Sequence, residues 1–197
     1  MLRNEEQEEQ RRQRNKRIVS WVIVILMVFS VFGFYVGSAD TTSTKYHGIK
    51  FTPTSQGVLA TINGQRYAFN YLPTQVEDIP VDSGILALLN QPILQVTYDP
   101  QSNYTQTLGG IQYFFQQAYG PQFNTYIIPG ITTNTTFSFP IITCANATTA
   151  QPVLAFFEDN ETRINVNNAC IQARGARAED FLRMTDNIML RKLGVLP

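Results

Sequence analysis

The hydrophobic positions of the chain form one long apolar run followed by many short ones. Residues 18–39, IVSWVIVILMVFSVFGFYVGSA, contain no charged residue over 22 positions. About 20 apolar residues in a helix are enough to cross the hydrocarbon core of a bilayer. The positive-inside bias predicts a transmembrane helix with its N-terminus in the cytoplasm, because basic residues crowd just before the run (Arg11, Arg12, Arg14, Lys16 and Arg17).

This run divides the chain into four predicted parts. A charged cytoplasmic tail covers residues 1–17, the transmembrane helix 18–39, a Thr- and Ser-rich linker 40–44, and an extracytoplasmic domain 45–197. The alternative is a cleaved signal peptide, because GSA at 37–39 is a small-x-small sequence. A secretory apolar region usually has only about 7–15 residues, however, which favours an uncleaved signal-anchor in the lipid bilayer.

Two glycines in the predicted span form a GxxxG pattern. Small residues at this spacing let two membrane helices approach closely. Gly33 and Gly37 therefore indicate a homodimer through the transmembrane helix, although glycine is also common in membrane helices that do not pair.

Strand and helix patterns alternate beyond the linker. Residues 57–72 carry two β-rich runs on either side of Asn63-Gly64, a dipeptide typical of a two-residue hairpin. Residues 152–159 and 162–174, joined at Asn160-Glu161, predict a second hairpin. The remaining runs predict a short helix, a buried strand, a helix, a strand and a closing amphipathic helix (83–91, 92–99, 104–120, 124–130 and 178–193). This order predicts an α/β (or α+β) domain in which helices pack on a mixed sheet with two β-hairpins.

The end of the chain resembles the thioredoxin-like fold. QPVLAFFEDNETRINV followed by a helix has that family's order of a proline that opens a strand, a tight hairpin and the final helix, and the resemblance covers about residues 92–193. It implies that Pro152 is the cis proline of the family. Redox-active members carry C-x-x-C at a helix N-terminus that lowers a thiol pKa. TYDPQSNY stands at the corresponding place, so the resemblance implies a binding or scaffolding relative without the dithiol.

The motifs around the cysteines carry a second resemblance. One N-terminal anchor, ITCANAT and a later NNAC are together similar to uncharacterised single-pass membrane proteins of small-genome archaea. This similarity implies a location in the cell membrane and implies no activity.

The chain has two cysteines, Cys144 and Cys170, and both follow the predicted span. An even number of cysteines in an oxidising compartment favours a disulfide. The alternative, a reactive pair, lacks C-x-x-C spacing and a neighbouring histidine. We therefore expect a structural disulfide that ties the segment around 140–144 to the last strand.

Four N-x-S/T triplets are candidate glycosylation sites (Asn103, Asn134, Asn146 and Asn160). Glycosylated asparagines are expected on surface loops. Asn160, at the tip of the second predicted hairpin, is the best candidate, and an unmodified polar loop is the alternative.

Charge and composition indicate which chemistries the domain lacks. The tail carries a formal charge of +2 and the rest of the chain −2, so no basic face for nucleic acid is indicated. The one histidine, His47, has no cluster around it that would bind a metal. The two acidic groups, 77–82 and 158–161, lack the ligand spacing of a calcium loop.

No nucleophile-elbow, P-loop or Rossmann pattern occurs. The prediction is a non-enzymatic binding or scaffolding protein that meets other envelope proteins, with no metal and no cofactor. The alternatives are an envelope enzyme or redox-assisting protein of thioredoxin-like ancestry, and a purely structural envelope component.

Overall fold

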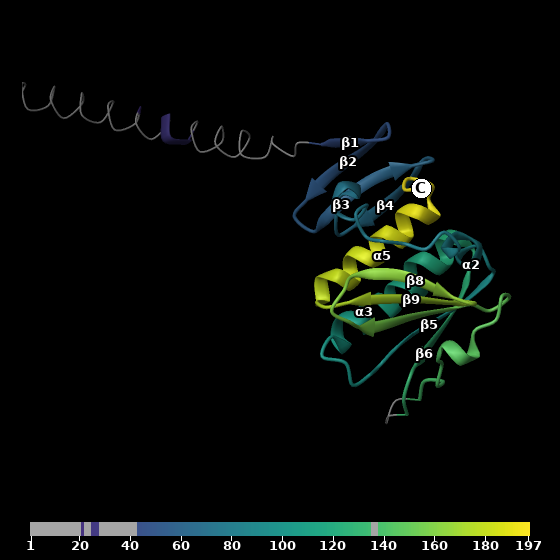
Figure 1. The fold of residues 1–197 in the computed structure, drawn as a ribbon. Helices are drawn as coiled ribbons and strands as arrows, with labels where there is room; N and C mark the ends of the chain where they lie inside the picture. The colour runs from purple at the N-terminus through teal and green to yellow at the C-terminus, as the bar shows by residue number, and fades with distance from the viewer. Residues whose placement is uncertain (1–20, 22–24, 28–42, 135–137) are drawn as a thin grey trace, which may run out of the picture. The chain divides into compact units, whose positions relative to one another are not determined.

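The computed structural model describes residues 21, 25–27, 43–134 and 138–197 (Figure 1). The charged tail, Gly33, Gly37 and most of the predicted transmembrane span lie outside the described residues. Of the span, Trp21 and residues 25–27 are helical. No helix within the described residues is both long enough and apolar enough to cross a membrane. Ser43–Pro197 form one compact unit.

The unit begins with a four-stranded antiparallel sheet in which each strand pairs with the next along the chain. Its turn at Asn63-Gly64 has positive φ at both residues, as a two-residue hairpin of this kind requires, so the first predicted hairpin is confirmed. Residues alternate between a buried and an exposed face along the third strand. The strands are β1 (Thr44–Tyr46), β2 (Ile49–Thr54), β3 (Gly57–Ile62) and β4 (Gln65–Phe69).

The second sheet is mixed and has five strands in the order β6-β5-β7-β9-β8. Strands β6, β5, β7 and β9 run parallel to one another. Strand β8, at the edge, is antiparallel to β9. The predicted α/β domain with a mixed sheet is therefore confirmed. The strands are β5 (Ile93–Tyr98), β6 (Tyr126–Ile131), β7 (Val153–Glu158), β8 (Arg163–Asn167) and β9 (Cys170–Gly175).

The second predicted hairpin is wrong in its pairing. The run 162–174 breaks at Asn168, which has a φ of 53°, because asparagine tolerates the left-handed conformation that a tight turn needs. The chain therefore turns back on itself to form the β8–β9 hairpin, and β9 takes the place beside β7 in parallel. The tight hairpin on which the resemblance to the thioredoxin-like fold depends is not formed between β7 and β8.

The bond before Pro152 also differs from the bond that this resemblance implies. No peptide bond among the described residues is cis, so the expected cis proline is wrong. Pro152 is buried, and its carbonyl accepts a hydrogen bond from the Gln95 N–H at 2.9 Å. The trans backbone thus leads directly into the parallel pairing of β7 with β5.

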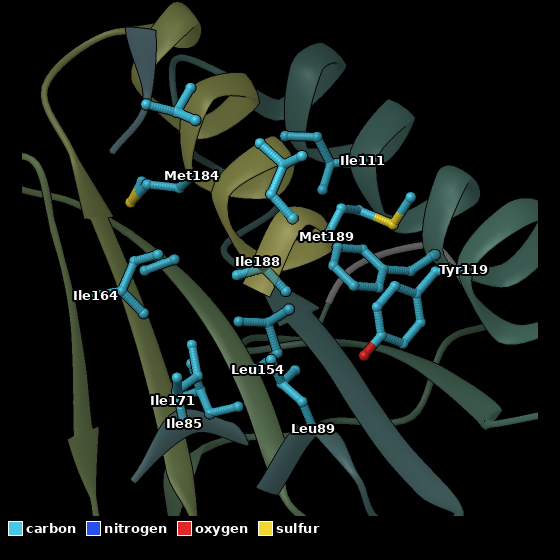
Figure 2. Close-up of a cluster of buried hydrophobic side chains, with 14 of the residues drawn as sticks. Ile85, Leu89, Ile111, Tyr119, Leu154, Ile164, Ile171, Met184, Ile188 and Met189 are labelled. Atoms are coloured by element: carbon cyan, nitrogen blue, oxygen red, sulfur yellow. The ribbon is translucent and has the colours of Figure 1, made fainter. Parts of the chain in front are cut away.

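The helices pack on one face of the five-stranded sheet. Figure 2 shows side chains of α3 and α5 meeting those of α2 and of strands β7, β8 and β9 in the core. The helix predicted over 104–120 is longer than expected and passes through a π-helical turn. The helices are α2 (Ile85–Leu89), α3 (Thr105–Phe114), the π-helical turn η2 (Phe115–Tyr119), α4 (Gly120–Phe123) and α5 (Ala178–Lys192), with short 3-10 turns at η1 (Pro73–Gln75) and η3 (Cys144–Asn146).

The closing helix α5 lies between the two sheets (Figure 1). One continuous core contains Phe181 and Ile188 of α5, Phe156 of β7, and Phe51 and Phe69 of the four-stranded sheet. Because α5 has sheet on both sides, its middle is buried almost all the way round. Polar residues at these positions are therefore enclosed as well, and two of them, Thr185 and Asp186, line a groove beside the helix.

Candidate functional site

A groove of about 360 Å³ opens between α3 and α5, beside the end of β4. Its size falls within the roughly 300–1,000 Å³ that is usual for ligand pockets. Apolar side chains form much of its lining, with amide, hydroxyl and carboxyl groups between them. Its lining includes Ala68, Asn70, Gln106, Gly110, Phe114 and Asp186.

Gly110 leaves the backbone of α3 open to the groove. A Cβ atom at this position would meet no other atom within 4 Å. Glycine inside a helix destabilises it by about 0.5–1 kcal/mol relative to alanine, and none of the described residues packs against this position closely enough to require it. The preceding glycine is different, since a Cβ at Gly109 would lie 3.3 Å from the Tyr98 hydroxyl.

Asp186 is the one ionisable residue that lines the groove. Its side chain is only 3% exposed. One carboxylate oxygen accepts hydrogen bonds from the backbone N–H groups of Asn70 at 2.7 Å and Tyr71 at 2.8 Å, and the other accepts from the Asn70 side chain at 3.3 Å. The carboxylate thus binds the chain where it leaves β4.

Burial and hydrogen bonding act on Asp186 in opposite directions. Burial raises the pKa of this carboxyl group, and the donors on Tyr71 and Asn70 counteract part of that effect, so that its pKa is about 7. A perturbed carboxyl group in a cleft is often found at functional sites. Here both oxygens are already bound by N–H groups, so the carboxylate positions the groove wall and is not a free base.

The neighbours of Asp186 on α5 hold the same segment. The Asn187 side chain donates to the Val76 carbonyl at 2.7 Å, and the Arg183 guanidinium donates to the Gln75 carbonyl at 2.7 Å and to Asp78 at 2.8 Å. The loop after β4 is therefore held against α5 by several polar contacts, just beyond the groove residue Asn70.

The carboxyl ends of the parallel strands are the usual ligand site of an open α/β sheet. At this edge Glu158 accepts hydrogen bonds from the Ser102 hydroxyl and from the Asn103 N–H at 2.8 Å. The bond with Ser102, together with those from Asn103, lowers the pKa of Glu158. Glu158 thus binds two residues just before α3, and its negative charge near this helix N-terminus is favourable.

Asp159 is occupied in a similar way. It accepts from the Asn160 N–H at 2.7 Å and forms ion pairs with Arg163 at 3.1 Å and Arg174 at 3.2 Å. The hydrogen bond from Asn160 and the two arginines lower the pKa of this carboxyl group. No group of three His, Cys, Asp or Glu residues in the described ranges is arranged to hold a metal ion.

The predicted disulfide between Cys144 and Cys170 is present, with the two Cα atoms 5.3 Å apart. It ties residues 140–152 to the face of the five-stranded sheet that the helices leave uncovered. The Thr97 hydroxyl donates to the Ile142 carbonyl at 2.8 Å, and Ile142 packs with Cys170 in a second small core. The disulfide therefore holds this segment on the sheet, and neither cysteine lines the groove.

The four predicted glycosylation sites all have exposed asparagines: Asn103, Asn134, Asn146 and Asn160. Asn103 donates from its side chain to Glu158 at 3.3 Å, and the Asn146 side-chain oxygen accepts from the Thr143 N–H at 2.8 Å. None of the four lines the groove.

The groove residues Gly110 and Asp186 were not predicted as a site. The sequence does contain a signal for each. Gly109-Gly110 interrupts a helical pattern, and Asp186 belongs to the polar run Thr185–Asn187 within an otherwise amphipathic helix. What the pattern could not provide is the contact with residues 70 and 71, which lie more than 100 positions earlier in the chain.

Both edges of the five-stranded sheet are covered. At β6, the Ile131 N–H donates to the Pro140 carbonyl at 3.0 Å, and Pro129 has no N–H to offer. At β8, the Ile164 N–H donates to the Pro80 carbonyl at 2.9 Å, and the Val166 N–H donates to Asp82 at 2.7 Å. Addition of a partner strand at these edges is therefore disfavoured.

Comparison with known proteins gave no match to a family model, to a curated protein or to a solved structure.

Proposed function

We propose that the chain is a single-pass membrane protein that displays its C-terminal domain outside the cytoplasm as a non-enzymatic binding or scaffolding module. The apolar run 18–39, with basic residues before it, supports the anchor and its orientation. The Cys144–Cys170 disulfide supports an oxidising compartment for the domain. The resemblance to single-pass membrane proteins of small-genome archaea implies the same location.

The groove between α3 and α5 is the observation that carries the binding function. Its lining is largely apolar, and its carboxylate, Asp186, is fully engaged by N–H groups of the protein itself. Such a groove suits an apolar side chain of a partner better than it suits a reaction that needs a free acid or base. The partner that fits is a short apolar segment of another envelope protein.

Modification and self-association are further parts of this proposal. The exposed side chains of Asn103, Asn134, Asn146 and Asn160 are consistent with glycosylation outside the cell. Pairing through Gly33 and Gly37 would give a homodimer within the membrane and would leave the groove open to a partner.

Photo-crosslinking of the full chain in its own membranes tests the binding function. A photoreactive residue at Gln106 lies in the groove, whereas one at Tyr113, which is 63% exposed on the same helix, lies outside the groove lining. We expect an adduct of defined mass from position 106 only, and its loss when Gly110→Trp fills the groove. Equal adducts from both positions, or an adduct that survives Gly110→Trp, would overturn the proposal.

A further inference from the structure

The four-stranded sheet has one face on the core and one face turned away from it. Phe51, Ala60 and Tyr67 are cross-strand neighbours on the buried face. The residues between them along the strands lie on the opposite face, because side chains alternate along a strand. We call this opposite face the cationic face. It includes Lys45, Lys50, Thr52, Leu59, Thr61, Arg66 and Ala68, the last of which also lines the groove.

The cationic face has no acidic residue to balance its charges. Residues 43–69 contain three basic residues and no acidic one, whereas residues 70–197 contain six basic and ten acidic residues. Among the ion pairs of the described residues, none involves Lys45, Lys50 or Arg66. Residues 43–69 therefore carry a net positive charge, whereas residues 70–197 carry a net negative charge.

The placement of the two lysines has an energetic cost. Lys45 and Lys50 are direct cross-strand partners, and like charges directly opposite each other destabilise a sheet. An anionic surface over this face would remove the repulsion. Leu59, which is 39% exposed on the same face, would also lose contact with water there.

The chain length places this face near a membrane. Four residues, 40–43, separate the predicted span from β1. An extended chain covers at most about 3.6 Å per residue, so β1 starts within about 18 Å of the end of the span. The headgroup layer itself occupies several ångströms of that distance.

We propose that the cationic face docks on anionic lipid headgroups of the membrane in which the chain is anchored. This inference depends on the proposed membrane anchor. Lipid fits better than nucleic acid, because the face has no aromatic side chain on which a base could stack. Each Lys or Arg close to an anionic membrane surface favours the docked state by about fivefold. Docking would fix the orientation of the domain and of its groove relative to the membrane.

Lysine reactivity of the full chain in lipid nanodiscs tests the inference. We expect an amine-reactive acylating reagent to modify Lys45 and Lys50 several-fold more slowly in phosphatidylglycerol-rich discs than in phosphatidylcholine discs, as measured by mass spectrometry. High salt should abolish the difference, because it screens surface charge. Lys192 is an internal control, since its ammonium group donates to Leu89 and Asn90 on another part of the domain.

A pair of charge-matched variants shows whether the cationic face is responsible. Arg66→Gln should lower the ratio of docked to undocked chain by about fivefold and so weaken the protection of both lysines. Arg177→Gln removes a side chain with the same charge that is 67% exposed and lies outside the four-stranded sheet. This variant should leave the protection of Lys45 and Lys50 unchanged.

The possible failures are distinguishable. A chain that is incorporated into the discs but shows equal lysine reactivity in both lipids overturns the docking inference alone. The same conclusion follows if Arg177→Gln weakens protection as much as Arg66→Gln, or if soluble polyglutamate protects the lysines and anionic lipid does not. A chain that elutes without lipid overturns the membrane anchor and, with it, the docking inference.

Discussion

At the scale of single residues, Asp186 links the closing helix to the first sheet. Its sequence neighbours Thr185 and Asn187 mark a polar run in an amphipathic helix, but the run gives no indication of which atoms it binds. The partners are the N–H groups of Asn70 and Tyr71. They become neighbours only when α5 inserts between the two sheets, which is a long-range event that local pattern cannot predict.

The raised pKa of Asp186 predicts a pH-dependent stability. Its folded-state value of about 7 lies above the roughly 3.9 of an unfolded aspartate, so the folded state binds the proton more tightly. We expect this group's contribution to the free energy of unfolding to be complete below about pH 4. It should be lost as the pH rises through about 7, a change on the order of 4 kcal/mol. Denaturant unfolding from pH 4 to 8 measures it.

The Asp186→Asn variant identifies the group responsible. Because the amide does not titrate, the difference in unfolding free energy between wild type and variant should change with pH over this range and level off above about pH 7. A difference that is constant from pH 4 to 8 would show that the carboxyl group is not the source.

The disulfide gives the second prediction at this scale. Closing a loop of the 26-residue separation between Cys144 and Cys170 stabilises a fold by roughly 3 kcal/mol in the loop-entropy model. The double variant Cys144→Ser/Cys170→Ser should therefore have a free energy of unfolding lower by roughly 3 kcal/mol, and should unfold at a lower denaturant concentration. Hydrogen exchange should rise in residues 140–152 and remain slow in α5. Unchanged stability and exchange would contradict a structural role.

At the scale of elements, local signals were reliable where a few adjacent residues decide the conformation. Asn63-Gly64 correctly predicted the β3–β4 hairpin, because both turn residues need positive φ. The expected helix 178–193 matches α5 (Ala178–Lys192) within one residue. The same type of signal was missed at Asn168, where an asparagine turn divides what looked like one strand into β8 and β9.

The pairing of the elements was less predictable than their positions. Residues 152–159 and 162–174 are close in sequence, so a hairpin between them is the simplest arrangement. The sheet instead places β9 between β7 and β8, which buries Ile171 and Ala173 under the helices. The choice depends on packing across the whole core, which the alternation of polar and apolar residues does not show.

Gly110 gives a prediction at the scale of the helix. A Cβ at this position meets nothing, and alanine is the better helix former, so Gly110→Ala should stabilise the domain by about 0.5–1 kcal/mol. It should also weaken crosslinking from position 106, because the methyl group enters the groove. Thermal unfolding and crosslink yield measure the two effects. Destabilisation, or an unchanged yield, would contradict the role assigned to Gly110.

At the scale of the whole molecule, charge is distributed unevenly along the chain. The basic tail precedes the apolar run, and the sheet that carries the cationic face follows it. Residues 70–197, which have a net negative charge, come last. The sequence predicted a charged tail, a span, a linker and a domain in this order, with the cysteines in an oxidising compartment, but it indicated no basic face on the domain. It did not predict that the basic residues of 43–69 gather on one face, because that requires the register of four strands.

Lysine labelling in intact right-side-out vesicles tests most directly whether the domain lies outside the cytoplasm on an N-terminal anchor. Lys16 stands before the predicted span, and Lys45 and Lys50 stand after it. With a membrane-impermeant amine reagent at high salt, we expect modification of Lys45 and Lys50 and none of Lys16 until the vesicles are permeabilised. Modification of Lys16 in intact vesicles, or protection of Lys45 and Lys50 there, would contradict the account.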